Sequence, residues 1–248
     1  MHQFFLDQPL TDDALSQPLV LSRKAYQHLF VLRLREGERF VLAEDGGREH
    51  LCTVTGVDKN TLTAEILETR LGTRELACRL VLLQGLPKRD KLELIIQKAT
   101  ELGASRIVPV MMARSNVRVD EKKAERKTER LHDIAKSAAE QSKRGCIPVV
   151  DGVTRFAEAL DAVQDADLKL ICYEEETQVG RLHALLPQLS QAKSVALLVG
   201  PEGGISEEEW QMAKAAGFQS VSLGRRILRT ETAGLCLLSY LMLHLENA

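Results

Sequence analysis

Aromatic residues are scarce in this sequence, and the patterns that mark membrane and metal-binding proteins are missing from it. Phe, Trp and Tyr together make up only 4% of the 248 residues. The five cysteines include no Cys-x-x-Cys pair, which argues against a zinc knuckle and a disulfide framework, and the six histidines show no metal-ligand spacing. The longest apolar runs, such as Val195–Val199, are far shorter than the roughly 20 residues of a membrane-spanning helix. We therefore expect no metal site and no membrane segment.

Neither sign of charge dominates the chain as a whole. There are 33 Lys and Arg residues against 35 Asp and Glu, a formal net charge of −2, which excludes a uniformly basic nucleic-acid binder. The first residues, Met1–Phe5, begin no signal peptide, and free cysteines fit a reducing compartment, so we expect a cytoplasmic protein. With 44% hydrophobic and 27% charged residues, the chain is predicted to fold around a substantial core.

The distribution of charge differs from its sum. Residues 106–144 hold eleven Lys and Arg against six Asp and Glu, a local charge of +5, so the rest of the chain carries −7. From Asp120 to Lys136, acids and bases alternate at i,i+4 spacing, which is typical of a solvated helix face. The flanking basic residues have fewer acids nearby and are the better candidates for phosphate contacts: Arg114, Arg118, Lys143 and Arg144.

The first part of the chain, residues 1–72, has the pattern of short strands joined by turns. Asp45-Gly46-Gly47 is a hairpin signal, because Asp-Gly readily adopts the positive φ angles of such a turn. A short helix with Ser22 as its N-cap fits 22–32. This pattern predicts a small β-rich domain of barrel or sandwich type. Its strands are expected at Val41–Ala43, Leu51–Val57 and Thr61–Leu67.

From about Arg74 the pattern changes to alternating strands and helices, which predicts a parallel sheet with helices on both faces over residues 73–248. Ligands of such sheets bind where the strands end, here after Leu83, Cys172, Val199 and Leu223. Strands are expected at Arg79–Leu83, Arg106–Val110, Ile147–Val150, Leu168–Cys172, Val195–Val199 and Gln219–Leu223. Helices are expected at Lys88–Leu102, Asp120–Gln141, Phe156–Val163, Arg181–Leu189, Ser206–Ala216 and Thr230–Leu245.

The loop after Val199 is rich in glycine and reads Gly-Pro-Glu-Gly-Gly-Ile-Ser from Gly200 to Ser206. Its glycines allow a ligand to approach the backbone closely, and Ser206 with Glu209 forms a capping box for the next helix. The loop lacks the Gly-Lys-Ser/Thr of a phosphate-binding loop and the Gly-x-Gly-x-x-Gly of a dinucleotide fold. Either an ordinary strand-to-helix turn or a backbone cradle for a nucleoside fits this pattern.

A second loop, 223–229, leads into the final helix and carries Arg225, Arg226 and Arg229. Thr230 is expected to cap that helix. Three arginines at the ligand edge of a sheet indicate an anionic substrate, or else arginines paired with acidic residues of the chain such as Glu202.

Taken together, the motifs resemble the RsmE family of ribosomal RNA methyltransferases. The resemblance rests on Gly200–Gly204, on Leu-Gly-x-Arg-Ile-Leu-Arg-Thr-Glu-Thr-Ala over 223–233, on Ile95–Gly103 and on Ala139–Arg144. It implies an enzyme that uses S-adenosylmethionine (SAM) to methylate N3 of a uridine in small-subunit rRNA. It also implies a homodimer with a PUA-like RNA-binding domain at 1–72 and a SPOUT methyltransferase domain at 73–248 that ends in a trefoil knot. The alternative is a non-catalytic RNA-binding or ribosome-assembly factor with the same fold.

The resemblance and the loop chemistry together define the candidate site. Arg229, which stays protonated, is expected to stabilise charge that develops on a uracil oxygen, and Glu231 is the second catalytic candidate. Glu202 and Glu140 are the other carboxylates, and the sequence does not identify which of the three is the base. The cofactor is expected to contact Tyr173, Leu198, Gly200, Pro201, Glu202, Gly203, Leu223, Gly224, Ile227, Leu228 and Thr232.

The chain departs from the family pattern at two places. His2-Gln3 stands before the paired phenylalanines, where relatives often have an arginine, and Lys143 stands where they have a glycine. Because aromatic residues for base stacking are few, RNA recognition is expected to rest on shape and phosphate contacts. The residues expected to make these contacts are Arg23, Arg33, Arg114, Arg118, Lys143 and Arg144.

Overall fold

The computed structural model describes residues 1–23, 26, 30–88, 91–116, 121–173 and 181–247, and only the backbone of 121–123. The chain divides into two compact units. The first combines Met1–Glu75 with Ala139–Ile147, and the second combines Leu76–Ala138 with Pro148–Ala248.

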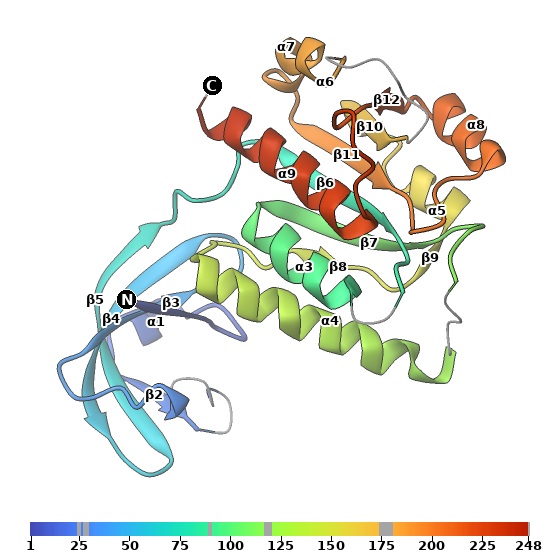
Figure 1. Cartoon of the computed structure of the whole chain (residues 1–248). Helices are drawn as coiled ribbons and strands as arrows, with labels where there is room; N and C mark the ends of the chain where they lie inside the picture. Colours follow the sequence, from blue (N-terminus) through green and yellow to red (C-terminus); the bar gives the residue numbers. More distant parts are fainter. Residues whose placement is uncertain (24–25, 27–29, 89–90, 117–120, 174–180, 248) are drawn as a thin grey trace. The chain divides into compact units, whose positions relative to one another are not determined.

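The first unit is built on a five-stranded sheet in the order β1-β3-β4-β5-β2 (Figure 1). Strands β1 and β3 pair in parallel, and the other neighbours pair antiparallel. The elements are β1 (His2–Phe5), α1 (Asp12–Leu15), β2 (Leu19–Ser22), β3 (Arg39–Ala43), β4 (Arg48–Val57) and β5 (Thr61–Leu71). This arrangement confirms the prediction of a small β-rich N-terminal region.

Local sequence accounts for much of this sheet. Gly46 and Gly47 have φ angles of +125° and +92°, which the hairpin turn between β3 and β4 requires and which other residues rarely adopt. Apolar residues from alternate positions form its core, with Phe40 and Leu42 completely buried. The helix expected at 22–32 falls largely outside the described residues.

The second unit holds a seven-stranded sheet in the order β12-β10-β11-β6-β7-β8, with β9 also paired to β7, and every pairing is parallel. Its strands are β6 (Arg79–Gly85), β7 (Ala104–Met111), β8 (Val149–Val150), β9 (Thr154–Arg155), β10 (Leu168–Cys172), β11 (Ser194–Val199) and β12 (Gln219–Val221). Its helices are α3 (Lys91–Glu101), α4 (Glu121–Ser142), α5 (Phe156–Asp161), α6 (Arg181–Ala184), α7 (Leu186–Leu189), α8 (Glu207–Ala215) and α9 (Thr230–Glu246).

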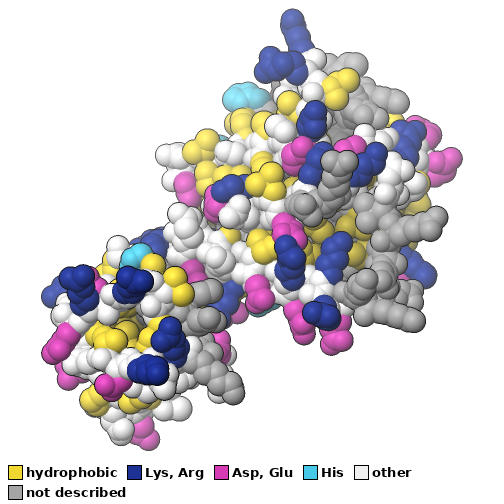
Figure 2. All heavy atoms as spheres, turned by 60° about the horizontal axis from the view of Figure 1, so that its bottom comes forward, with side chains coloured by type: hydrophobic (Ala, Val, Ile, Leu, Met, Phe, Trp, Pro, Cys, Tyr) yellow, Lys and Arg dark blue, Asp and Glu magenta, His cyan; other side chains and the backbone are white. Residues whose placement is uncertain are grey.

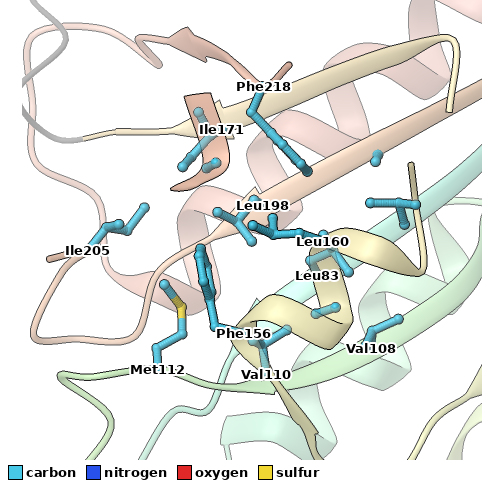
Figure 3. Packing of buried hydrophobic residues seen from close by; sticks show 14 residues of the cluster. Leu83, Val108, Val110, Met112, Phe156, Leu160, Ile171, Leu198, Ile205 and Phe218 are labelled. Carbon is cyan, nitrogen blue, oxygen red and sulfur yellow. The ribbon is translucent and has the colours of Figure 1, made fainter. Parts of the chain in front are cut away.

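Helices cover both faces of the parallel sheet, as the sequence pattern predicts. Helices α3 and α9 pack together on one face, where α9 contacts β6 and β11 (Figure 1). On the opposite face Leu83, Val108 and Leu198 pack against Phe156 and Leu160 of α5 (Figure 3). Because successive residues of a strand point to opposite faces and both faces are covered, β11 is buried at all six positions, and the five from Val195 to Val199 are apolar. The α/β prediction is confirmed.

The structure corrects the prediction of one continuous helix at Arg181–Leu189. Two short helices, α6 and α7, occupy this segment, and a proline lies in the first turn of α7. Proline at position 187 has no N–H to donate to the preceding turn, so a continuous helix loses a hydrogen bond there. No helix in the described residues combines the length and apolar character needed to cross a membrane.

Candidate active site

A cavity of about 830 Å³ lies at the carboxyl edge of the parallel sheet, where β10, β11 and β12 end. Parallel α/β sheets bind ligands at this edge, and the cavity has the size of a small-molecule site. Residues expected from the sequence form much of its wall: Tyr173, Gly200, Pro201, Glu202, Leu223, Gly224, Ile227, Leu228 and Arg229. Others complete it: Lys91, Cys172, Val199, Gly204, Ile205, Val221, Ser222, Arg225, Arg226, Thr230 and Ala233.

The loop after β11 folds back tightly, and glycine is required for this geometry. A Cβ on Gly200 would lie 2.7 Å from Cγ1 of Ile205, and one on Gly85 would lie 2.6 Å from the backbone nitrogen of Pro201. Gly204 has a φ of +74° and donates its N–H to the carbonyl of Pro201 at 2.9 Å. Glycine therefore allows the loop to fold this tightly at the wall of the cavity.

The predicted capping box of α8 is confirmed, and the carboxylate of Glu209 also accepts a hydrogen bond from a second loop. The Ser206 hydroxyl accepts from the N–H of Glu209, and Glu209 Oε2 accepts from the N–H of Ser206 at 3.0 Å. Oε1 of the buried Glu209 also accepts from the N–H of Ala113 at 2.7 Å. In the same loop after β7, Arg114 donates to the carbonyl of Gly203 at 3.2 Å. Two loops at the edge of the sheet are thus tied together through one carboxylate.

Thr230 does not cap α9, so that prediction is wrong. The N-cap is Arg229, which makes no side-chain capping bond. The hydroxyl of Thr230 instead donates to the carbonyl of Gly200 at 2.6 Å and accepts from Nε2 of Gln84 at 2.8 Å. Both Gln84 and Thr230 are buried. A neutral hydrogen-bond chain therefore connects the end of β6, the start of α9 and the glycine-rich loop.

The acidic residues of the site pair with a lysine. Lys91 Nζ lies 2.9 Å from Glu202 Oε1 and 3.1 Å from Glu231 Oε2. Burial favours the neutral form of Glu202, but hydrogen bonds from Lys91, from its own N–H and from the N–H of Lys88 outweigh this, so the pKa of Glu202 lies below its ordinary value. The same two carboxylates raise the pKa of Lys91. Glu202 and Lys91 are therefore both charged at neutral pH.

One end of the cavity is aromatic. The ring of Tyr173 stacks on Trp210 of α8, with ring centroids 4.8 Å apart, and its hydroxyl lies 3.4 Å from Glu207. Tyr173 therefore both packs at the end of its strand and lines the cavity. Beside it, burial raises the pKa of Cys172 to about 12, so its thiol is not ionised at neutral pH.

Several sequence-predicted residues do not line the cavity. Leu198 is buried in the core, and Gly203 and Thr232 lie outside the cavity wall. Glu231 faces Lys91 instead of the cavity. Glu140 accepts from the N–H of Phe5 at 3.0 Å, within the first unit. Of the three carboxylates considered as the base, only Glu202 lines this cavity.

The residues expected to contact RNA occupy different environments. Arg23 is exposed, donates to the carbonyl of Lys59 at 3.1 Å and lies over the ring of Phe30, and Arg33 is exposed with a φ of +52°. Arg114 is exposed, and Arg118 lies outside the described residues. On the face shown in Figure 2, basic and acidic side chains are interspersed.

Lys143 and Arg144 are held by neighbouring groups of the first unit. The ammonium of Lys143 donates to the carbonyl of Glu140, and its φ of +63° falls in the left-handed region. Arg144 is 5% exposed, its guanidinium pairs with Glu75, and its carbonyl accepts from the amide of Gln3. Arg144 is therefore not part of the RNA surface that we propose below. Among the described residues there is no group of three or more potential metal ligands.

The fold and the site define an α/β protein with a nucleoside-sized cavity between two glycine-bearing loops. Comparison with known proteins shows which family of α/β proteins the chain resembles. A family model described as an RNA methyltransferase domain matches residues 74–242, and one described as an RNA methyltransferase PUA domain matches residues 21–67. The ribosomal RNA small subunit methyltransferase E of Bacillus subtilis (strain 168) is 37% identical over 245 residues, covering 96% of this chain and 95% of that protein.

Two solved structures extend the similarity to three dimensions. The ribosomal RNA small subunit methyltransferase E of Neisseria gonorrhoeae, bound to SAM, has a TM-score of 0.85 at 32% identity and covers 98% of this chain and 97% of that one. A methyltransferase of Legionella pneumophila in complex with SAM has a TM-score of 0.82 at 31% identity, over 97% and 96% of the two chains. The chain belongs to the ribosomal RNA small subunit methyltransferase E family, RsmE.

Proposed function

We propose that this protein is a SAM-dependent methyltransferase that methylates N3 of a uridine in small-subunit ribosomal RNA. The observation that carries the proposal is the cavity formed by the 200–205 and 222–229 loops, in a chain that matches SAM-bound relatives over nearly its full length. The family supports the reaction and the class of substrate, and the choice of uridine N3 rests on the resemblance of the motifs.

The residues of the cavity fit the cofactor. Its volume of about 830 Å³ lies in the range of roughly 300–1,000 Å³ found for small-molecule sites. The backbone of Gly200–Glu202 and of Leu223–Leu228 is available to an adenosine, because glycine leaves that backbone accessible and Tyr173 adds an aromatic surface. When bound, SAM supplies an electrophilic methyl group on a sulfonium.

Arg229 is one of the cavity residues that can assist the substrate. A uracil N3 must lose its proton before it can act as a nucleophile, and the resulting charge spreads onto the neighbouring oxygens. Arg229 lines the cavity, is exposed, and does not use its side chain to cap α9. Its guanidinium can therefore stabilise that oxygen charge by hydrogen bonding. We assign Glu231 a supporting role through Lys91, which separates it from the cavity.

RNA binding in this proposal combines two parts of the chain. Residues 1–72 form a PUA-like RNA-binding domain with Arg23 and Arg33, while residues 73–248 form the catalytic domain with Arg114 next to the cofactor loop. Lys143 and Arg118 remain part of this proposed surface. Because such contacts release counterions from RNA, affinity for a small-subunit rRNA fragment is expected to fall steeply as salt rises. A flat salt dependence would contradict phosphate recognition.

We further propose a cytoplasmic homodimer with the knotted C-terminal path of SPOUT enzymes. Ile227, on a loop of the cavity, is 92% exposed, and Leu243 of α9 is 55% exposed. A second copy of the chain that covers these residues would bury apolar surface beside the cofactor site. Light scattering on a size-exclusion column should give about twice the 27.6 kDa chain mass. A single-chain mass at micromolar concentration would contradict this.

Methyl transfer is tested with labelled SAM and small ribosomal subunits that lack the modification. Digestion of the rRNA followed by mass spectrometry of the nucleosides should locate the label on N3-methyluridine. Fully modified subunits are the matched control and should accept no label. Binding of RNA with no transfer of label would favour the non-catalytic assembly factor. Label on another nucleoside would support a methyltransferase but contradict uridine N3 as its target.

A further inference from the structure

Lys91 connects two of the segments that line the proposed cofactor cavity, the loop after β11 and the start of α9. It is the first residue of α3, and its ammonium lies between Glu202, in the loop after β11, and Glu231, in the first turn of α9. These carboxylates are separated by 29 positions in the sequence (231 minus 202), and Lys91 lies more than a hundred residues before either. The three side chains are partly buried: Lys91 is 27%, Glu202 24% and Glu231 17% exposed.

The stability of α3 does not explain a lysine at this position. A positive charge in the first turn of a helix is unfavourable, because the unpaired N–H groups there already carry partial positive charge. Lys98, near the other end of α3, has the favourable placement and pairs with Glu101 in the same helix. The partners of Lys91 lie outside its own helix, so its charge serves the contact between segments.

Because Lys91 is paired with two carboxylates, it is not a free cation that could bind an anionic ligand. Its ammonium lies between two carboxylates, 2.9 Å from Glu202 and 3.1 Å from Glu231, so it is already paired on both sides and is not available to a phosphate. Glu202 additionally accepts the N–H of Lys88 at 3.2 Å. The contacts of Lys91, Glu202 and Glu231 therefore serve to hold the segments that carry these residues in place.

We propose that Lys91 is a positioning residue of the methyltransferase, which holds the 200–206 loop and the start of α9 at the spacing that cofactor binding requires. The proposal rests on the proposed function for the identity of the ligand. Glycine at positions 200, 203 and 204 gives the backbone of the 200–206 loop more conformational freedom than other residues would, so an external tie reduces the freedom that a ligand would otherwise have to remove. Lys91 thereby acts on the cofactor through the two segments it joins.

The experiment compares Lys91→Met, Lys91→Arg and Lys98→Met in the full-length protein. Lys98 is the matched control, since it is an ion-paired lysine of the same helix that does not line the cavity. Binding of S-adenosylhomocysteine is measured by calorimetry and by the emission of Trp210, the only tryptophan of the chain, which stacks on Tyr173. Lys91→Met should weaken binding about tenfold, Lys91→Arg by less than about threefold, and Lys98→Met not at all.

Two further measurements separate positioning from other roles. Because the tie acts on cofactor binding, Lys91→Met should raise KM for SAM and leave KM for RNA unchanged. Glu231→Gln should lower affinity in the same direction, and the double variant should be no worse than Lys91→Met alone, since both changes break one connection. Thermal melting establishes that each variant is folded. If Lys91→Met melts early, Glu202→Gln breaks the same tie from the other side and carries the test.

The binding measurements test the role of Lys91 whether or not the protein methylates rRNA. Normal binding of S-adenosylhomocysteine by folded Lys91→Met, or additive effects in the double variant, would overturn it. The proposal would also be overturned if Lys91→Met and Lys91→Arg lost turnover equally while both kept normal cofactor binding. That pattern indicates that Lys91 contacts the reacting groups directly. If wild-type protein binds S-adenosylhomocysteine but transfers no methyl group to rRNA, the proposed function fails, while the binding series still tests Lys91.

Discussion

Lys143 provides a test of how the chain accommodates a residue other than glycine in the left-handed region. Its φ of +63° lies in the left-handed region, where a Cβ costs about 1–2 kcal/mol through contact with the following carbonyl. We compare Lys143→Ala with Lys143→Gly. Both remove the hydrogen bond from the ammonium to the carbonyl of Glu140, so the two variants differ only in the Cβ. Glycine loses roughly 0.5–1 kcal/mol more backbone entropy on folding, which offsets part of the relief. The glycine variant should therefore be the more stable by about 0.5–1 kcal/mol.

The same pair of substitutions at Lys127 supplies the control. Lys127 is exposed in the interior of α4, where alanine should be more stable than glycine by about 1 kcal/mol. Urea unfolding followed by circular dichroism gives the free energy of unfolding of all four variants. The expected result is a reversal of sign between the two positions. If the alanine variant is as stable as the glycine variant at position 143, or more stable, the positive φ does not strain the backbone there.

Three further predictions concern the cavity. Arg229→Ala should abolish methylation and leave the melting temperature unchanged; wild-type turnover would remove Arg229 from the site. Thr230→Val, which deletes the hydroxyl between Gln84 and Gly200, should cost about 1–3 kcal/mol of stability and weaken cofactor binding, whereas Thr230→Ser should behave as wild type in melting and calorimetry. Because the pKa of Glu202 is lowered in the folded protein, its contribution is present above the ordinary value of 4.5 and is lost as pH falls through the lower folded value. Affinity for S-adenosylhomocysteine should thus stay level down to about pH 5, and a decline centred near pH 6 or 7 would contradict this assignment.

The parts of the site that the sequence predicts well are contiguous. The glycine-rich segment after Val199 and the arginine-rich segment after Leu223 each carry their signal in adjacent residues, and the parallel sheet brings both loops to one edge. The capping box of Ser206 and Glu209 is likewise local, so spacing alone is enough to predict it.

The residues that the sequence misplaces depend on distant partners. Thr230 has the composition and position of a cap, but its hydroxyl is used by Gly200 and Gln84 instead. Arg144 belongs to a segment with surplus positive charge, yet a carboxylate 69 residues earlier in the chain pairs with it and burial removes it from the surface. Lys91 could not be singled out because its two acidic partners lie more than a hundred residues away.

The bond from Thr230 to Gly200 also has a consequence for synthesis. A polypeptide is made from its N-terminus, and the helix α9 comes after all strands of the parallel sheet in chain order. The glycine-rich loop therefore lacks its partner until α9 has left the translating ribosome. A nascent chain that has completed all seven strands still has an unfinished cavity, so cofactor binding is among the last properties that each new molecule acquires.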